Sequence, residues 1–149
     1  MEYTYKYPRP MVTVDAVVFT NNGNDKDTEV LLIKRKNNPY LGYWALPGGF
    51  IEMSETLEES IYRELKEETG IDNIKLARFN TYDDPGRDPR GRTITVAFWG
   101  MESKNKLWPS AGSDAESYKW FPVNHLPDMA FDHDKIIREA MVEANIDQL

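Results

Sequence analysis

The sequence contains no cysteine, and it is short of positive charge. Without cysteine the protein cannot form a disulfide, a thiolate metal site or a cysteine nucleophile. Its 18 lysines and arginines stand against 25 aspartates and glutamates, which gives a formal net charge of −7. Nucleic acids and anionic membranes select basic surfaces, so this balance argues against both as partners. A phosphorylated substrate would need metal ions to offset the repulsion.

Segments that direct a chain to or across a membrane are also missing from the sequence. No apolar run approaches the length of a transmembrane helix. The N-terminus has neither the basic region nor the apolar region of a secretory signal. Together with the lack of cysteine, these features predict a soluble, cytoplasmic protein.

The composition predicts a packed core. The chain has 149 residues, of which 40% are apolar and 12% aromatic. This suits one domain that buries most of its apolar surface. The sequence shows no repeat, low-complexity tract or linker, so we expect a single domain over 1–149. Residues 1–10, in which three tyrosines alternate, are expected to form an extended arm.

Short runs rich in β-branched and aromatic residues alternate with turn-like segments. Strands are expected at 11–20, 29–35, 74–82, 92–101 and 118–123. Residues 37–49 contain two prolines and three glycines, which predicts a loop with a short extended piece. After Asp132 apolar residues recur at helical spacing, which predicts a C-terminal helix. This order favours an α/β fold with a mixed sheet and helices packed against it.

The central helix is predicted from its two ends. Thr56 and Glu59 match a capping box, in which the two side chains satisfy each other's backbone amides. Gly70 suits the left-handed position just beyond a C-terminus. The predicted helix is therefore Leu57–Thr69. Its apolar residues repeat every four positions and should face the core.

Three glutamates of this helix lie beside its apolar stripe, at positions 64, 67 and 68. Carboxylates at the edge of a buried face are partly desolvated, so they must be paired, protonated or bound to metal. Hard cations such as Mg²⁺ prefer oxygen ligands of this kind. The alternative is a solvated face, which is the usual role of glutamates on a helix.

Gly49, Glu55 and the run Arg63–Ile71 (RELKEETGI) match the pattern G-x5-E-x7-R-E-U-x-E-E-x-G-U, where U is apolar, at every defined position over 49–71. This segment resembles the Nudix box. The resemblance implies an α/β/α sandwich with a mixed sheet, in which the box forms a catalytic loop–helix–loop. It also implies hydrolysis of a nucleoside diphosphate linked to another moiety.

The resemblance implies a metal site and a water-activating group. Glu64, Glu67 and Glu68 should include the ligands of Mg²⁺, with Mn²⁺ as an alternative ion. A backbone carbonyl near Gly49 is a further candidate ligand. A metal lowers the pKa of a bound water and offsets the phosphate charge. Glu67 and Glu68 are therefore also candidates for catalysis.

Two other box residues are expected to support the glutamates. By resemblance, Arg63 orients them and Glu55 braces the loop onto the helix. The general base stays open at this point. It is either a box glutamate or Glu116, which with Asp114 lies in the loop before the last expected strand. A solvated loop acid is the competing interpretation for Glu116.

Flanking segments bear on the substrate. WALPGGFIE, PGRDPRGRTITVAF and LPDMAFDHDKII together resemble the ADP-ribose pyrophosphatase branch of the family. That likeness implies ADP-ribose as substrate, with AMP and ribose 5-phosphate as products. Arg87, Arg90 and Arg92 are then candidates to bind the diphosphate or the terminal ribose, because arginine binds phosphate with two parallel hydrogen bonds. The alternative is that these arginines pair with aspartates of the same loop.

Aromatic and imidazole side chains have two interpretations each. Tyr40, Tyr43 and Trp44 either stack on adenine or pack their loop onto the core. His125 and His133 form no pattern of metal ligands, so both are predicted to be structural.

Other functions remain alternatives. The same box serves enzymes that hydrolyse nucleoside triphosphates or other nucleotide sugars. A non-catalytic, ADP-ribose-sensing regulatory domain is less favoured, because regulators of this family commonly have degraded boxes and usually carry a winged-helix segment after the domain. A homodimer is expected by analogy with ADP-ribose-specific relatives.

Overall fold

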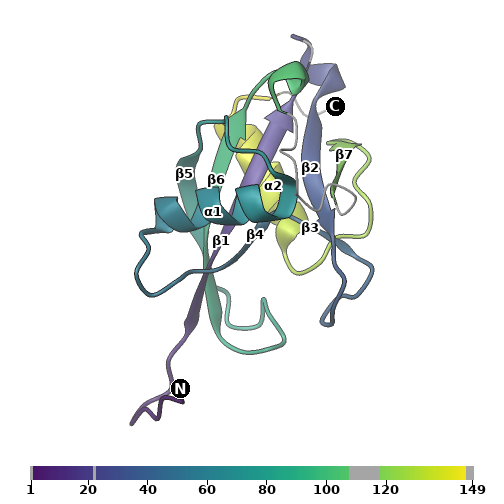
Figure 1. The fold of residues 1–149 in the computed structure, drawn as a ribbon. Helices are drawn as coiled ribbons and strands as arrows, with labels where there is room; N and C mark the ends of the chain where they lie inside the picture. The colour runs from purple at the N-terminus through teal and green to yellow at the C-terminus, as the bar shows by residue number, and fades with distance from the viewer. Residues whose placement is uncertain (1, 22, 108–117, 147–149) are drawn as a thin grey trace.

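Strand β1 (Met11–Thr20) organises a mixed sheet in the computed structural model, which describes residues 2–21, 23–107 and 118–146. In these ranges the other elements are β2 (Glu29–Lys34), β3 (Trp44–Ala45), β4 (Gly48–Phe50), α1 (Leu57–Thr69), β5 (Ala77–Tyr82), β6 (Thr93–Met101), β7 (Tyr118–Pro122) and α2 (His133–Glu143), with short 3₁₀ turns at Asp25–Asp27 and Lys104–Lys106 (Figure 1). The strand order is β3-β2-β1-β6-β5, while β4 pairs with β1 and β7 pairs with β2.

Strands β1 and β2 separate soon after the loop that joins them. They pair only at Phe19–Thr20, whereas β1 pairs in parallel with β6 along almost its whole length. Beyond that point the segment Trp44–Phe50 joins both strands, because β3 pairs with β2 and β4 pairs with β1. The sheet therefore divides at one end. The glycine-rich turn of the box lies at this division.

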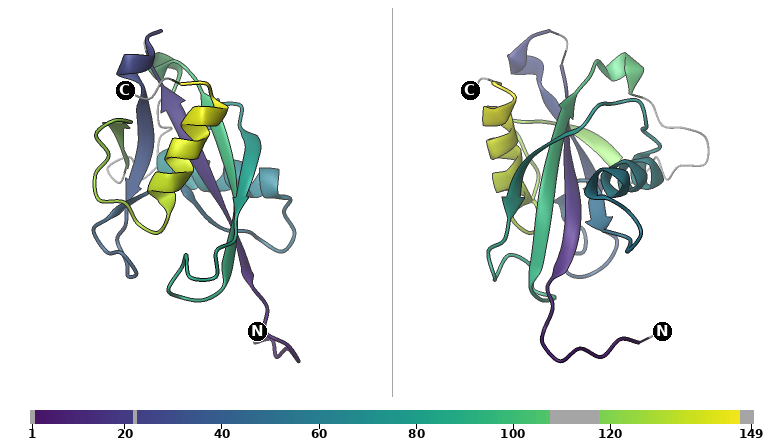
Figure 2. Two further views of the ribbon diagram at one scale, coloured as in Figure 1. Left: turned by 180° about the vertical axis from the view of Figure 1, so that it is seen from behind. Right: turned by 90° about the vertical axis from the view of Figure 1, so that its left-hand side faces the viewer.

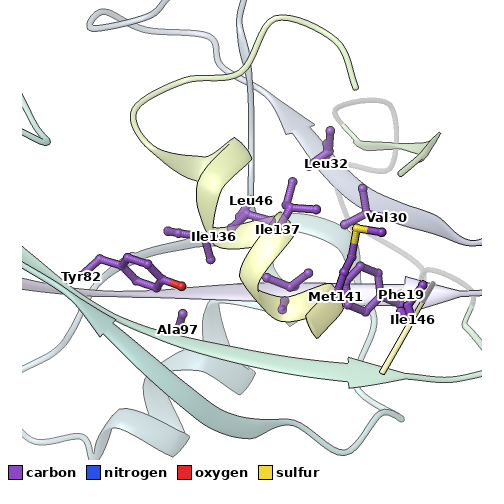
Figure 3. Packing of buried hydrophobic residues seen from close by; sticks show 12 residues of the cluster. Phe19, Val30, Leu32, Leu46, Tyr82, Ala97, Ile136, Ile137, Met141 and Ile146 are labelled. Atoms are coloured by element: carbon purple, nitrogen blue, oxygen red, sulfur yellow. The ribbon is translucent and has the colours of Figure 1, made fainter. Parts of the chain in front are cut away.

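The two helices cover opposite faces of the sheet (Figure 2). Val17 and Phe19 of β1 point into one apolar cluster with the buried side chains of α2 (Figure 3). Val14, Ala16 and Val18 point into the other cluster with the buried side chains of α1. Successive side chains of β1 thus alternate between the two clusters, so the strand is buried on both faces. This confirms the α/β/α sandwich that the resemblance implies.

Both predicted ends of helix α1 are confirmed. The Thr56 side chain accepts a hydrogen bond from the amide of Glu59, and the Glu59 carboxylate accepts one from the amide of Thr56. Gly70 has φ = 77° and donates its amide to the carbonyl of Lys66. Ile61 and Leu65 are fully buried, so the apolar stripe faces the sheet as expected.

Four expected strands are shorter than the sequence predicts: those at 29–35, 92–101 and 118–123 by one residue each, and that at 74–82 by three. The strand expected at 74–82 begins at Ala77, because the amide of Leu76 donates to the Tyr62 hydroxyl of α1 instead of to a neighbouring strand. Strand β2 ends at Lys34, although the amide of Arg35 still donates to the carbonyl of Tyr43, next to the pairing of Lys34 with Trp44.

Residues 2–10 form no helix or strand and extend away from the sheet (Figure 1). Their three tyrosines are exposed. Within the ranges that the structure describes, neither helix combines the length and apolar character needed to cross a bilayer.

Candidate functional site

A pocket of about 390 Å³ opens where the sheet divides. Its walls come from β1, the end of β2, the segment Trp44–Phe50, the last turns of α1, the loop before β6 and the start of α2. We call the carboxylates Glu67 and Glu68, which line the pocket with Gly48 and Gly49, its acidic end, and the lining arginines Arg35, Arg87 and Arg90 its basic end. The pocket thus offers both carboxylates and cations to one ligand.

Glu68 is the carboxylate held most tightly against the glycine turn. Its Oε1 accepts the amide hydrogen of Gly48 at 2.8 Å. The pKa of Glu68 is raised to about 8, mainly by burial and also by the nearby carboxylates of Glu64 and Asp15, although the Gly48 hydrogen bond opposes the shift. A carboxyl group in such surroundings favours either a proton or a cation.

Arg63 gathers three box carboxylates. Its Nε lies 2.7 Å from Glu55, and its Nη1 lies 2.9 Å from Glu64 and 3.3 Å from Glu67. Hydrogen bonds from Arg63 and then from the Ser60 hydroxyl lower the pKa of Glu55. Burial raises the pKa of Glu64, although Arg63 opposes that shift. The structure thus brings Arg63 and Glu55 together beside the glutamates, in the arrangement that the expected orienting and bracing roles require.

Gly49 lies directly against the Glu64 carboxylate. A Cβ atom at Gly49 would come within 2.8 Å of the Glu64 carboxyl carbon and of one of its oxygens. While Glu64 keeps this rotamer, only a residue without a side chain fits at position 49. The box glycine therefore provides space for the Glu64 carboxylate, and it is not among the residues with positive φ.

The donor atoms at this end of the pocket fit a hard divalent cation in kind. They are carboxylate oxygens, including those of the largely desolvated Glu68, and the Glu64 carboxylate lies close against Gly49. In the described ranges, however, no three carboxylate or imidazole side chains are placed so that they could hold a metal together. Glu64 and Glu67 are instead turned towards Arg63. These two side chains must rotate to bind an ion with Glu68.

A group of buried, hydrogen-bonded polar side chains lies next to the glycine turn. The amide of Leu46 donates to Nδ1 of His133 at 3.0 Å, and Nε2 of His133 lies 3.7 Å from the Asp15 carboxylate. Asp15 also accepts the Thr95 hydroxyl at 2.6 Å. Because Nδ1 accepts a hydrogen bond, the neutral ring carries its proton on Nε2, facing Asp15. Burial lowers the pKa of His133, although Asp15 opposes the shift.

We expect that replacing His133 by asparagine makes the free energy of unfolding depend less on pH below about pH 6.5. The native pKa lies below the unfolded value of 6.5, so below pH 6.5 the unfolded chain binds a proton that the native protein excludes. The free energy of unfolding should therefore fall as the pH is lowered from about 6.5, by at most about 1.4 kcal/mol per pH unit. Asparagine can still accept the Leu46 amide but does not titrate.

Urea unfolding of the wild type and His133→Asn between pH 5 and pH 7.5 measures this slope. The matched control is His125→Asn, at an exposed histidine next to Asn124. It should keep the wild-type slope. An unchanged slope in His133→Asn would show that another group carries the acid dependence.

The three arginines predicted to bind substrate do not converge. Arg87 and Arg90 line the pocket, whereas Arg92 lines a separate polar hollow beside β5 and α2. Arg87 is almost fully buried and makes two hydrogen bonds, of 2.9 and 2.7 Å, to Asp132 at the start of α2. Arg90 makes two hydrogen bonds, of 3.1 and 2.8 Å, to Asp88 of its own loop. Pairing with an aspartate of the same loop thus holds for Arg90 but not for Arg87.

The aromatic residues near the glycine turn mostly pack among themselves. Trp44 stacks edge-on against Phe121, at 4.7 Å between ring centroids, next to the core cluster under α2. The ring of Tyr40 packs edge-on against the rings of Tyr43 and Phe131, with ring centroids 5.5 Å and 4.9 Å apart. Of these residues, Phe131 lines the pocket. Asp114 and Glu116, the candidate bases outside the box, lie outside the described residues.

Arg35 and Phe131 are among the pocket residues that were not singled out from the sequence. Arg35 follows strand β2 and Phe131 precedes helix α2, and both line the basic end of the pocket. The only sequence signal for Arg35 is its place in the basic run KRK, directly after an apolar strand. Phe131 is one aromatic among many, so nothing in the sequence distinguishes it.

Comparison with known proteins gives a consistent result. The NUDIX domain family model matches residues 9–140. An ADP-ribose pyrophosphatase from Methanocaldococcus jannaschii is 45% identical over 135 residues, which cover 91% of this chain and 75% of that protein. The ADPR responsive transcriptional repressor NtrR from Acinetobacter baylyi is 34% identical over 93% of this chain, which spans 56% of the repressor's length.

A solved structure is similar over the same range. The NUDIX domain of Shewanella oneidensis NrtR, complexed with ADP ribose, superposes with a TM-score of 0.79 and 34% identity. The match covers 95% of this chain and 94% of that chain.

Proposed function

The chain belongs to the Nudix family of hydrolases, and from that premise we propose that it hydrolyses the pyrophosphate bond of ADP-ribose to AMP and ribose 5-phosphate in an Mg²⁺-dependent reaction. The observation that carries the choice of substrate is the 45% identity to an ADP-ribose pyrophosphatase over 91% of this chain. Mn²⁺ is the alternative ion, because the oxygen donors at the acidic end of the pocket suit either.

The residues of the pocket divide the work between its two ends. A bound divalent ion would lower the pKa of a water molecule and offset charge on the phosphate oxygens. Glu68 keeps its position through the Gly48 amide, whereas Glu64 and Glu67 would turn away from Arg63 to bind the same ion. The basic end of the pocket faces the remaining phosphate charge. Water adds across one P–O bond of the diphosphate, and no covalent intermediate is needed.

The proposal is tested by a substrate panel. The purified protein is incubated with Mg²⁺ and ADP-ribose, nucleoside triphosphates, dinucleotides or other nucleotide sugars, and the products are identified by chromatography. We expect AMP and ribose 5-phosphate from ADP-ribose, slower turnover of the other compounds, and no turnover when the divalent ions are chelated. Preference for triphosphates would overturn the substrate and leave the metal-dependent hydrolysis intact.

A sensing role is the second candidate function, because one relative is a transcriptional repressor responsive to ADPR. In that case the protein binds ADP-ribose but releases it unchanged. Isothermal titration with ADP-ribose, run beside the product assay, separates the two functions. The expected homodimer and the expected absence of a nucleic-acid partner stay predictions of this proposal.

A further inference from the structure

Arg35 holds a fixed place at the basic end of the pocket. Its backbone amide pairs with the carbonyl of Tyr43, and its Nε donates to the carbonyl of Pro39 at 2.7 Å. The guanidinium carbon lies 5.0 Å from the ring centroid of Phe131. The head group of Arg35 is thus held by the loop on one side and by an aromatic ring on the other, so its plane is largely set before any ligand binds.

The charge of Arg35 is balanced differently from that of the other pocket arginines. Arg87 and Arg90 each make a two-pronged ion pair, with Asp132 and Asp88 respectively. No carboxylate in the part of the chain that the structure describes comes within 4.0 Å of the Arg35 guanidinium. Arg35 is therefore the pocket arginine whose hydrogen-bond donors are not already committed to a described carboxylate.

The surroundings of Arg35 disfavour a bare positive charge. Burial lowers the pKa of Arg35, and the neighbouring charge of Arg90 lowers it further, while Asp88 and Glu68 act in the opposite direction. A cation that is partly desolvated and close to a second cation gains more from a bound anion than a fully solvated one. Arg35 and Glu68 line the same pocket.

Phe131 supports this arrangement at some conformational cost. Its backbone has φ = 53°, a left-handed conformation that is uncommon for a bulky residue. In this conformation the ring lies 5.5 Å from the guanidinium of Arg90 and 5.3 Å from the ring of His133, as well as against Arg35. Uncommon backbone conformations of this kind cluster at binding sites.

We propose that Arg35 is the principal phosphate-binding side chain of the pocket and that Phe131 fixes the plane of its guanidinium. This inference rests on the proposed function, because the phosphate is one of the two in the nucleoside diphosphate substrate. Glu67 and Glu68 then face one part of the diphosphate at the acidic end, while Arg35 donates two parallel hydrogen bonds to oxygens at the other end. Arg87 instead holds helix α2 in place through Asp132.

Steady-state kinetics with ADP-ribose and Mg²⁺ test this assignment. We expect Arg35→Gln to raise KM by about 10- to 100-fold, which corresponds to the loss of a charge-assisted hydrogen bond. Arg35→Lys should recover only part of the loss, because lysine keeps the charge but not the two-pronged geometry. Phe131→Leu should raise KM less than Arg35→Gln. The matched control is Arg138→Gln, which removes an exposed arginine of α2 that pairs with Asp134.

Equilibrium binding separates this inference from the proposed function. Titration of AMP and of inorganic pyrophosphate in the presence of a chelator measures anion binding without turnover. Binding that weakens in Arg35→Gln but not in Arg138→Gln supports Arg35 as the phosphate-binding side chain, even if the wild type fails to hydrolyse ADP-ribose. The converse result is that the wild type hydrolyses ADP-ribose while Arg35→Gln and Arg35→Lys both keep the wild-type KM. That result would overturn the role of Arg35 in phosphate binding and support the proposed function. Circular dichroism verifies that each variant is folded. If Arg35→Gln does not fold, the comparison of Arg35→Lys with the wild type provides the test.

Discussion

Replacing Glu68 by glutamine is expected to reduce kcat for ADP-ribose by at least about 100-fold, since loss of an outer-shell partner of a metal site alone costs about 10- to 100-fold. Glutamine keeps the shape of the side chain and can still accept the Gly48 amide, but it removes the charge that a divalent ion needs. The pKa of Glu68, raised to about 8 by burial, indicates that the carboxylate is held in an unfavourable environment when no cation is bound. The variant should therefore be at least as stable as the wild type without metal.

Turnover by Glu68→Gln is measured with ADP-ribose at saturating Mg²⁺, and thermal unfolding is followed in the presence of a chelator. The control is Glu58→Gln on the same helix, where the carboxylate forms an exposed pair with Arg78. Exposed pairs contribute little, so this variant should keep wild-type activity and nearly wild-type stability. A Glu68→Gln protein with near-normal kcat would exclude Glu68 from the metal site. A large fall in stability would instead show that the carboxylate supports the fold.

Replacing Gly48 by alanine is expected to destabilise the fold by about 3 kcal/mol, the upper part of the usual range for an overpacked site. The added Cβ would lie 2.1 Å from the carbonyl oxygen of Val14 and 2.6 Å from Oδ1 of Asp15. Strand β1 cannot move away easily, because it is paired with β6 on its other edge. The melting temperature should fall by roughly 6 to 12 °C for a chain of this size.

Calorimetry of three glycine variants checks the cause. Gly86→Ala is the control, because its Cβ would meet no atom closer than 3.8 Å. It should change stability by less than about 0.5 kcal/mol. In Gly49→Ala the clash is with the end of the Glu64 side chain, which can rotate, so activity should fall more than stability does. Equal melting temperatures for Gly48→Ala and Gly86→Ala would contradict the close approach of β4 to β1.

Local features of the fold were predictable because their causes are local. The bounds of α1 follow from the capping box at Thr56 and the left-handed glycine at position 70, and both signals lie within one turn of the helix ends. The ends of the strands were less predictable. Strand β5 begins at Ala77 and not at Ile74, because the Tyr62 hydroxyl on α1 takes the amide of Leu76. No window of sequence around Ile74 contains that partner.

In the candidate site, too, some features were predictable from the local sequence and others were not. The spacing of Gly49, Glu55 and the run Arg63–Ile71 identified the acidic end of the pocket, because a turn followed by a helix places these residues together without help from the rest of the chain. The state of the carboxylates was not determined by that spacing. The raised pKa of Glu68 depends on burial and on Asp15, a residue of another element.

The sequence by itself determined the family and the helix that carries the glutamates, since each depends on residues close together in the chain. Only the tertiary structure decided which cations line the pocket. Of the predicted arginines, Arg87 and Arg90 line it, each paired with an aspartate, whereas Arg92 lines another hollow. Folding also brings Arg35 to the pocket, against the ring of Phe131. The pairing of charges in a pocket is set by distances between segments far apart in the chain, and these distances exist only once the sheet has formed.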